Sequence, residues 1–524
     1  MPAPLLILLP HGLNASGVTL WAVRLAGALA GEGRRVGLLL HREPAGQRRL
    51  DVALSPLVRV FDGRDLPPLD DEPVDQAALV HAYGEAITAM AEGSGEPVIV
   101  SPNLHGECYG AVVGVASREP SRVRLIGWQH SDIAYDTQVL AHYEPVLSRF
   151  VGVSDAIESR LRSRLSQRAH DIVNIPYGVE VTAHPPQRDA LDGSRPLRLV
   201  YTGRLEHAQK RIAALIHMSD ALIQRGARHE LVIVGDGPAS AALSTAAASR
   251  PAITLLGAHP PHRVLEELNR ADIFVLASRY EGLSVSLLEA MARGCIPVVT
   301  RTHSGAAQAI VPGESGEIAD IAPEADEPAA GEALANAVIR AMSLGLASMS
   351  TAAWRTARDR FALEAHATAV ARLLDAVARE SPRAWPAHRP CEFNPADGAA
   401  CGTVPADAAE RLSAVLALLS GRRVVLHGAG RHTQRLGDVI ERSPANIIAI
   451  ADDDPQRHSG MCLGRPVIAP ARAGDLGATD IVISSWLHED DIWARRAMYT
   501  SRGLIVHRVY DPSSSRNEAQ QVAA

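Results

Sequence analysis

The stretch from Arg279 to Gly294 constrains the fold of this chain more than any other. It lies between two short apolar segments, Ile273–Leu276 and Ile296–Val299, whose length and β-branched residues predict buried strands. Between them, a serine followed by apolar residues at helical spacing predicts a helix, and Gly294 supplies its stop signal. The order strand, helix, strand predicts one unit of an α/β sheet.

Two glutamates in this stretch predict a ligand site. Glu281 stands in the loop at the carboxyl end of the first strand, where open α/β sheets bind ligands, and Glu289 follows about two helical turns later. The backbone N–H groups of Gly282, Leu283 and Ser284 would be unpaired at the helix N-terminus, which suits a diphosphate. Because carboxylates accept hydrogen bonds from hydroxyls, one site could hold a phosphate by backbone and a sugar or ribose by side chains.

Taken alone, two glutamates separated by seven residues also fit a charged surface beside an amphipathic helix. Here Glu281-x7-Glu289 is followed by Ala-Met-Ala-x-Gly and an apolar strand. This run resembles the signature of retaining glycosyltransferases of the GT-B fold in family 4, the group 1 transferases. The resemblance implies an α/β fold of GT-B architecture, in which two Rossmann-like domains face a cleft. It extends from about residue 5 to about residue 380, with several motifs in the expected order.

Composition restricts the class of protein and its partners. A chain of 524 residues is expected to form roughly two to four domains, and 47% hydrophobic with 21% charged residues is typical of a soluble globular protein. The net charge of −7 provides no overall basic field that would recruit nucleic acid or anionic lipid. No window reaches about 18 uninterrupted apolar residues, so we expect no membrane span.

Two further features favour a cytoplasmic protein without a metal site. The apolar run Pro4–Pro10 has no basic region before it and is followed by a glycine loop, which predicts a first strand and not a signal peptide. Cys391 and Cys401 could pair, although free thiols are the simpler expectation. The five cysteines are scattered and odd in number, which fits a reducing compartment and offers no zinc spacing: Cys108, Cys295, Cys391, Cys401 and Cys462.

The N-terminal segment predicts a strand over Leu5–Leu9, a glycine loop, a helix from about Thr19 to Ala30 and a strand over Val36–Leu40. In this βαβ opening, the backbone at the helix N-terminus can approach a phosphate. The loop lacks a complete G-x-G-x-x-G. In the family that the chain resembles, the equivalent loop lies against the donor diphosphate, which assigns this role to Gly17.

Polar loops follow the next predicted strands, Val98–Val100 and Leu125–Trp128. Each loop contains a histidine, His105 and His130, at the sheet edge expected to face the cleft. The run Trp-Gln-His-Ser-Asp around His130 is similar to the family's loop whose histidine contacts the donor sugar. A loop histidine is often structural, and with 21 histidines in the chain, chance placement is an alternative, most of all for His105.

Two later segments, Phe150–Ile157 and Ile172–Val179, resemble the run with which the family closes its N-terminal domain. The second segment contains Tyr177 where the family usually has an asparagine. We therefore expect an altered contact at this turn.

A loop with basic residues follows the strand predicted over Leu197–Tyr201. Gly203 allows a tight turn, and Arg204 and Lys210 could converge on one anion, arginine through bidentate hydrogen bonds and lysine as a point charge. A solvated basic loop is the alternative interpretation. In the family, an arginine and a lysine at these places bind the phosphates of the donor and stabilise the leaving group.

The resemblance implies a distinct role for each of these side chains. Glu281 would position the donor sugar, Glu289 would hold the ribose hydroxyls, and His130 would contact the sugar. No metal motif appears, and cations of the protein could replace one, so no cofactor is expected beside the nucleotide-sugar donor. One departure concerns the sugar site, because family members often have an aromatic residue and a glycine where this chain has Leu283-Ser284.

A further α/β module is predicted after residue 410. A helix over Arg411–Leu419 and a strand lead to the glycine loop His427–His432, and an acidic run follows the strand Ile447–Ala451. A glycine pair after a strand, with an acid about two dozen residues later, favours dinucleotide binding, but Thr433 stands where the third glycine is expected. The module resembles small Rossmann-like domains attached to sugar-modifying enzymes, and a structural or docking role is an equal alternative.

The chain is thus predicted to contain three Rossmann-like parts, a linker and a disordered tail. The boundaries are 1–183 for the N-terminal, acceptor-side domain, 184–380 for the nucleotide-sugar-binding domain with helices that cross back, 381–409 for the linker, 410–511 for the additional module and 512–524 for the tail.

The expected function is transfer of a sugar, with retention of anomeric configuration, from a nucleotide-sugar donor to a glycan, lipid-linked or small-molecule acceptor. A GT-B epimerase or phosphorylase is an alternative within the same fold. Two alternatives belong to other classes: an NAD-linked oxidoreductase that acts through the C-terminal module, and a non-catalytic scaffold that binds nucleotide sugars.

Overall fold

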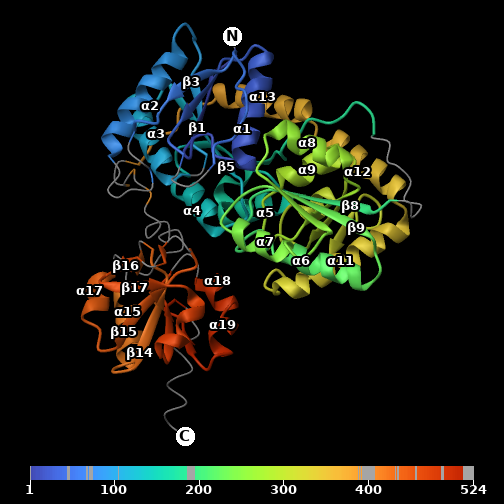
Figure 1. The fold of residues 1–524 in the computed structure, drawn as a ribbon. Helices are drawn as coiled ribbons and strands as arrows, with labels where there is room; N and C mark the ends of the chain where they lie inside the picture. Colours follow the sequence, from blue (N-terminus) through green and yellow to red (C-terminus); the bar gives the residue numbers. More distant parts are fainter. Residues whose placement is uncertain are drawn as a thin grey trace. The chain divides into compact units, whose positions relative to one another are not determined.

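The chain forms two compact units, Met1–Phe393 and Asn394–Ala524. The first contains two sheets and the second contains one (Figure 1). The predicted linker lies partly, and the predicted tail wholly, outside the described residues. The computed structural model describes residues 2–43, 48–66, 69, 75–103, 105–185, 195–386, 389, 391, 393, 408–430, 432–433, 436–454, 457–458, 460–485 and 489–510.

The N-terminal sheet has seven parallel strands in the order β3-β2-β1-β4-β5-β6-β7. Its order reverses between β1 and β4, which is where open α/β sheets bind ligands. The strands are β1 (Leu5–Leu9), β2 (Val36–Leu40), β3 (Arg59–Asp62), β4 (Val98–Ser101), β5 (Val123–Gln129), β6 (Leu147–Gly152) and β7 (Ile172–Asn174).

The second sheet has six parallel strands in the order β10-β9-β8-β11-β12-β13. Here the order reverses between β8 and β11. The strands are β8 (Leu197–Thr202), β9 (His229–Val234), β10 (Ile253–Gly257), β11 (Ile273–Leu276), β12 (Ile296–Thr300) and β13 (Glu317–Ala319).

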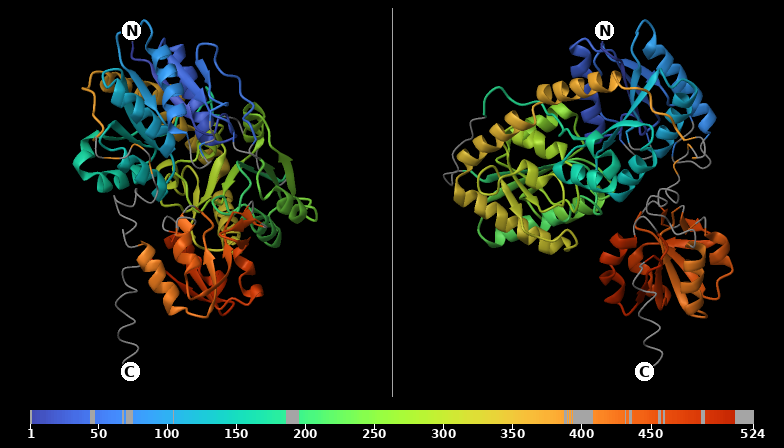
Figure 2. Two further views of the ribbon diagram at one scale, coloured as in Figure 1. Left: turned by 90° about the vertical axis from the view of Figure 1, so that its left-hand side faces the viewer. Right: turned by 180° about the vertical axis from the view of Figure 1, so that it is seen from behind.

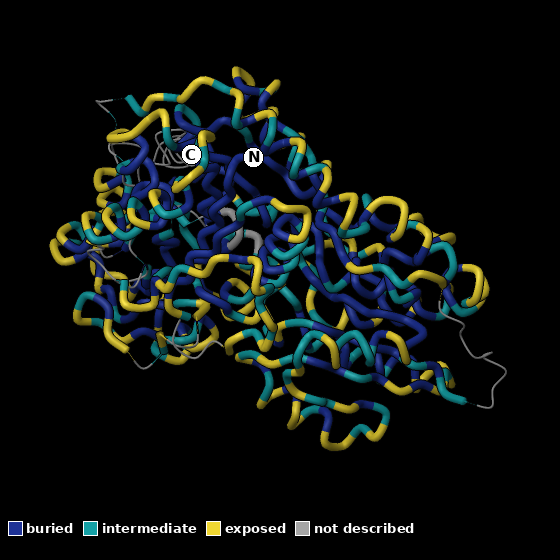
Figure 3. The backbone as a smooth tube through the Cα atoms, turned by 90° about the horizontal axis from the view of Figure 1, so that it is seen from above, coloured by how far each residue is buried: buried dark blue, intermediate teal, exposed yellow. Residues whose placement is uncertain are grey.

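Helices connect most of the consecutive parallel strands. The central strands are buried, whereas exposed residues gather in the outer helices and loops (Figure 3). The predicted α/β class is therefore confirmed. The helices of the first unit are α1 (Gly17–Gly31), α2 (Gln76–Ala91), α3 (Gly106–Arg118), α4 (Ala134–His142), α5 (Asp155–Arg164), η1 (Ser166–Asp171), α6 (Ala214–Gln224), α7 (Ser240–Ala247), α8 (Pro261–Arg270), α9 (Val285–Ala292), α10 (Ala306–Ala309), α11 (Glu327–Leu344), α12 (Leu346–Arg360) and α13 (Leu363–Ala378).

The connection back to the N-terminal domain runs through α12 and α13. Between them the chain pairs with the first interdomain connection, because Val179 N donates to Phe361 O at 2.8 Å and Leu363 N donates to Val179 O at 3.0 Å. Beyond this point α13 packs on α1 and β4 (Figure 2). Both passages between the domains are thus joined by backbone hydrogen bonds at one place.

A buried histidine fixes α13 to the N-terminal domain. Trp21 Nε1 donates to His366 Nε2 at 2.8 Å, and His366 Nδ1 lies 2.7 Å from the carbonyl oxygen of Pro176. Since an indole N–H only donates and a carbonyl only accepts, His366 must be neutral, with its proton on Nδ1. Burial lowers the pKa of His366 to about 4, which agrees with this state.

The residues after α13 also contact the N-terminal domain. Tyr143 Oη donates to the carbonyl oxygen of Cys391 at 2.8 Å, and Arg383 Nη2 lies 3.1 Å from Asp171 Oδ2. Phe393 fits so closely against Gly106 that a Cβ there would lie 2.7 Å from the phenylalanine side chain. The described residues at the start of the predicted linker are therefore packed on the first unit.

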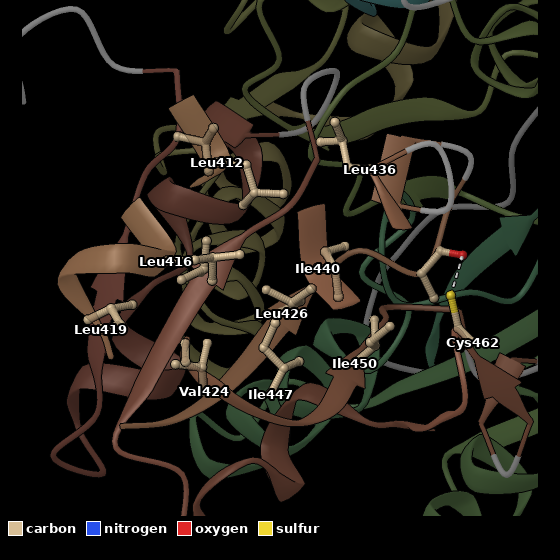
Figure 4. Close-up of a cluster of buried hydrophobic side chains, with 14 of the residues drawn as sticks. Leu412, Leu416, Leu419, Val424, Leu426, Leu436, Ile440, Ile447, Ile450 and Cys462 are labelled. Atoms are coloured by element: carbon tan, nitrogen blue, oxygen red, sulfur yellow. Dashed lines mark hydrogen bonds between the residues drawn. The ribbon is translucent and has the colours of Figure 1, made fainter. Parts of the chain in front are cut away.

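The second unit contains a sheet in the order β16-β17-β15-β14-β18-β19, parallel except for the β16–β17 pair. Apolar side chains from α15, α17, β14 and β15 meet in its core (Figure 4). The elements are α15 (Ala408–Leu418), β14 (Arg423–His427), α17 (Gly437–Glu441), β15 (Asn446–Ala451), β16 (Met461–Cys462), β17 (Arg465–Ile468), η4 (Pro470–Arg472), η5 (Gly474–Leu476), β18 (Asp480–Ile483), α18 (Glu489–Ala494), α19 (Ala497–Thr500) and β19 (Ile505–His507).

Within the described residues, no single helix is both long and apolar enough to span a membrane. The pair α11 and α12, bent by 103° at its break, meets the criteria of length and composition only when the two helices are taken together.

Replacement of His366 with glutamine is expected to weaken the loss of stability in acid. Below about pH 6.5 the unfolded chain takes up a proton at this position that the folded protein, with a pKa of about 4, does not. The free energy of unfolding therefore falls as the pH drops from about 6.5 to 4, by roughly 1.4 kcal/mol per pH unit at this site. Melting temperatures at about pH 7 and about pH 5 should differ less in His366→Gln than in the wild type.

The exposed His262 of α8 provides a matched control. We expect His262→Gln to keep the pH dependence of the wild type. An equal drop in melting temperature for His366→Gln and the wild type would contradict a buried, neutral His366.

Candidate functional site

Two loops meet at the reversal point of the second sheet. One follows β8 and carries Gly203, Arg204 and Lys210, and the other follows β11 and carries Glu281. Arg279 N donates to the carbonyl oxygen of Gln209 at 2.8 Å, which joins the loops through their backbones. The structure therefore places these predicted residues at the edge of the sheet where a ligand is expected.

Glu281 is buried, and two side chains donate to its Oε1. Lys210 Nζ lies 2.6 Å from Glu281 Oε1, and the hydroxyl of Ser278 donates to the same oxygen at 2.6 Å. Beside these residues is a cavity of about 10 Å³, which is room for a single water molecule and not for a sugar. The carboxylate is thus oriented by the protein before any ligand arrives.

Lys210 has a property that the motif analysis did not use: it is the only lysine among the 52 basic residues of the chain. An ammonium is compact and can point three donors in different directions, whereas a guanidinium is a planar fork. In a chain that otherwise uses arginine throughout, a lysine packed against Glu281 indicates that this position needs the smaller group.

Arg204 lies farther out than Lys210. Its side chain is 51% exposed, and its Nη2 is 3.3 Å from Glu206 Oε1 and 3.5 Å from Gln209 Oε1. Gly203, just before it, has a φ of 151°, and Tyr201 Oη donates to the carbonyl oxygen of Arg204 at 2.8 Å. The side chain of Lys210 is only 15% exposed, so Lys210 lies deeper than Arg204 at this edge of the sheet.

The N-terminus of α9 faces the N-terminal domain. Ser284 caps this helix, because its hydroxyl accepts from Leu287 N at 3.4 Å, and Leu283 precedes it as a buried residue. Opposite lies the start of α1, where a Cβ on Gly17 would be 3.4 Å from the Cβ of Val285. The positive ends of two helix dipoles thus come together between the domains.

At Gly282 the backbones of the two domains approach each other closely. A Cβ at this position would lie 2.0 Å from the carbonyl oxygen of His130. The hydroxyl of Ser304 donates to the carbonyl oxygen of Gly282 at 2.7 Å and lies 2.6 Å from the hydroxyl of Ser154 on the other domain. Only glycine allows the two loops to meet at this distance.

His130 lies at the predicted loop, but its ring is buried in the N-terminal domain. Its Nδ1 is 2.7 Å from Tyr177 Oη, and its Nε2 is 3.4 Å from Asn103 Oδ1. The ring stacks on Trp128 with centroids 5.9 Å apart, and burial lowers the pKa of His130 to about 3. Tyr177, the departure from the family pattern, therefore holds the ring of His130, whose carbonyl oxygen faces the second domain.

Glu289 has a partner that the sequence analysis missed. Arg24 Nη2, from α1 of the N-terminal domain, lies 2.7 Å from Glu289 Oε1. The side chains are 10% and 9% exposed. The signal available in the sequence was a charged residue between the apolar positions of α1, two turns after Gly17.

His105 belongs to a separate cluster at the reversal point of the first sheet. Its Nδ1 lies 2.8 Å from Glu107 Oε2, and its ring is 5.7 Å from that of His11. Among the residues that the structure describes, no group of three or more histidine, cysteine, aspartate and glutamate residues could hold a metal ion.

In the second unit, the glycine loop after β14 is hydrogen-bonded to Asp452, which follows β15. Ala429 N donates to Asp452 Oδ2 at 2.7 Å, and Gly428 has a φ of 119°. Thr433, at the place of the expected third glycine, is fully buried and donates to Ser484 Oγ at 2.8 Å. In a dinucleotide site, the acidic residue at the place of Asp452 would bind the ribose. Here the Asp452 carboxylate already accepts a hydrogen bond from the backbone N–H of Ala429.

Residues 196–344 match the family model described as "Glycosyl transferases group 1". The matched segment contains both loops of the candidate site, with Lys210 and Glu281, and the helix that carries Glu289. This segment is therefore similar to group 1 glycosyltransferases.

Two curated relatives illustrate the sequence similarity. The chain is 29% identical over 241 residues to the putative colanic acid biosynthesis glycosyltransferase WcaL of Salmonella typhimurium. This alignment covers 41% of this chain and 58% of that protein. It is 34% identical over 166 residues to the GDP-mannose-dependent alpha-(1-6)-phosphatidylinositol dimannoside mannosyltransferase of Mycobacterium tuberculosis. That alignment covers 30% of this chain and 42% of the mannosyltransferase. The chain therefore spans about half the length of these relatives.

The fold is similar to that of the pneumococcal O-GlcNAc transferase GtfA, solved in complex with UDP and GlcNAc. The TM-score is 0.57 at 13% sequence identity, and the match covers 72% of this chain and 100% of that one. The predicted GT-B architecture of two Rossmann-like domains is thereby confirmed, and the sheet of the second unit confirms the additional Rossmann-like module.

Replacement of Gly282 with alanine is expected to lower the melting temperature. The added Cβ would overlap the carbonyl oxygen of His130, a backbone atom that cannot rotate away. Overpacking of this kind costs about 1–3 kcal/mol of unfolding free energy. Thermal unfolding followed by circular dichroism measures the change.

Gly31→Ala is the matched control, because a Cβ at the last residue of α1 would contact nothing within 4 Å. It should leave the melting temperature unchanged or slightly raised, since alanine favours helix over glycine. If Gly282→Ala melts like Gly31→Ala, the domains do not meet at Gly282.

Proposed function

We propose that this protein is a retaining glycosyltransferase that moves a sugar from a nucleotide-sugar donor to an acceptor at the interface of its two GT-B domains. One observation carries the proposal. The paired Lys210 and Glu281 stand at the reversal point of the second sheet, on the loops that adjoin the N-terminus of α9, where that helix faces Gly17. A cation, a carboxylate and a helix N-terminus at one sheet edge suit a diphosphate linked to a sugar.

The leaving group is the first requirement of the reaction. When the bond between the anomeric carbon and the phosphate oxygen breaks, its electrons stay on the diphosphate, and positive charge develops on the sugar. Lys210 can donate to Glu281 and still direct two further N–H groups to phosphate oxygens. We assign stabilisation of the diphosphate to Lys210, Arg204 and the N–H groups of Gly282–Ser284, aided by the backbone at Gly17 and Gly203.

The carboxylates hold the rest of the donor. Glu281, fixed by Ser278 and Lys210, is assigned to the hydroxyls of the donor sugar, and Glu289 to those of the ribose. The loop of His130 reaches the second domain at Gly282, and we assign to it the remaining sugar contact. No cofactor beside the donor is required by this scheme.

Retention means that the acceptor oxygen bonds to the anomeric carbon on the face from which the diphosphate leaves, and the proton of the acceptor hydroxyl passes to an oxygen of the departing diphosphate. We infer it from the Glu281-x7-Glu289 signature. For the acceptor we propose a glycan or lipid-linked or small-molecule hydroxyl compound, in keeping with the names of the two relatives. The described cysteines Cys108, Cys295, Cys391 and Cys462 are free, which supports a reaction in the reducing cytoplasm.

A panel of nucleoside diphosphates tests the donor site. UDP and GDP are the first probes, because they occur in the names of the similar proteins. One of the panel should raise the melting temperature, since saturation at about 100 times the dissociation constant adds roughly 2.7 kcal/mol to the unfolding free energy. Lys210→Ala should lower the rate of hydrolysis or transfer of the matching nucleotide sugar by about 10²–10³-fold, because it removes a charge that faces the leaving group.

Two variants sharpen this test. Lys210→Arg keeps the charge but not the compact shape, and we expect a rate between those of the wild type and Lys210→Ala. Arg301→Ala removes an exposed arginine, paired with Asp320 at 2.9 Å, that follows β12 at the same edge of the sheet, and the rate should not change. Equal rates for Lys210→Ala and Arg301→Ala, or a panel in which no nucleotide binds, would overturn the proposed function.

A further inference from the structure

Helix α1 of the N-terminal domain and helix α9 of the second domain lie side by side. Gly17 opposes Val285 at the N-termini of α1 and α9, and further along the same helices Arg24 opposes Glu289. The ion pair of 2.7 Å between Arg24 Nη2 and Glu289 Oε1 joins the domains. It places a guanidinium of the N-terminal domain against the carboxylate that we assign to the donor ribose.

The pair is incomplete on the arginine side. Arg24 Nη1 is buried and has no hydrogen-bond partner among the described residues. A buried charged group is normally satisfied at every donor, and an unpaired donor is a cost to the folded state. Because the guanidinium is a rigid planar fork, the unpaired nitrogen lies next to the one that holds Glu289.

We propose that Arg24 is a further donor-binding residue, whose Nη1 donates to an oxygen of the ribose while Glu289 accepts from the ribose hydroxyls. The inference rests on the proposed function, since it deepens the description of that same site. It gives the unpaired nitrogen a partner of the kind that its position and charge require.

The chemistry of the pair suits a diol. An arginine only donates hydrogen bonds, and an ionised glutamate only accepts them, whereas each hydroxyl of ribose does both. The two vicinal hydroxyls can therefore satisfy Arg24 and Glu289 together. A 2′-deoxy or 3′-deoxy sugar would leave a buried donor or acceptor unpaired, which sites of this kind reject strongly.

The pair also makes ribose binding a property of both domains. Glu289 belongs to the domain of the second sheet and Arg24 to the N-terminal domain, so a ribose held by both is bound only while the domains are in contact. Arg24 thereby becomes a residue that determines specificity for ribonucleotides.

Isothermal titration of the full chain tests the inference with the nucleoside diphosphate that binds the wild type and with its 2′-deoxy and 3′-deoxy counterparts. Loss of one charge-assisted hydrogen bond predicts an affinity about 10-fold lower in Arg24→Ala for the ribonucleotide. For the deoxy compound that lacks the bonded hydroxyl, Arg24→Ala and the wild type should differ little. Arg24→Lys, which keeps the charge, should recover part of the affinity for the ribonucleotide.

Arg34→Ala is the matched control. Arg34 is buried, like Arg24, and pairs with Asp375 of α13 at 2.6 Å, away from the loops of the site. Arg34→Ala should show the same difference in affinity between the ribonucleotide and its deoxy counterparts as the wild type, whatever its effect on melting temperature. An affinity for the ribonucleotide in Arg24→Ala that equals or exceeds that of the wild type, or a loss of the same size for all three compounds, would overturn the inference. If no nucleoside diphosphate binds the wild type, the proposed function fails instead.

Discussion

The close approach of two backbones, at Gly282 and at the carbonyl oxygen of His130, sets the geometry of the candidate site. No side chain fits between them, so the loop after β11 lies directly on the N-terminal domain. From this contact follows the position of α9, whose first residue faces Gly17 and whose Glu289 faces Arg24. The site between the domains is therefore built from helix ends and loops that a single glycine allows to meet.

Charge pairing organises what lies around that contact. Each of the two buried carboxylates has one cation beside it, Lys210 for Glu281 and Arg24 for Glu289, as burial of a charge requires. A nucleotide sugar brings negative phosphates and neutral hydroxyls. In the proposed complex the phosphates share the cation of the first pair, and the hydroxyls bridge the second, so that the donor completes interactions that the free protein already holds in place.

The sequence was sufficient for the local elements of the second sheet. The sequence predicted a helix that begins after Ser284 and ends before Gly294, and the structure places it at Val285–Ala292. Such cap and stop signals can be recognised because they act within a few residues. The ion pair between Arg24 and Glu289 could not be predicted from the sequence, because it joins residues far apart in the chain and depends on how two domains meet. The same holds for His130, whose loop was predicted, whereas the direction of its ring depends on Tyr177 and Trp128.

The most direct test of this account observes Lys210 itself. Reductive methylation with ¹³C-formaldehyde keeps the positive charge and labels only this side chain and the N-terminal amine, because the chain contains no other lysine. Nuclear magnetic resonance can then follow both signals during titration with UDP and GDP. We predict that the Lys210 signal shifts to saturation with the nucleotide that binds, while the terminal signal stays in place. A nucleotide that binds without moving the Lys210 signal would contradict a donor site at Lys210 and Glu281.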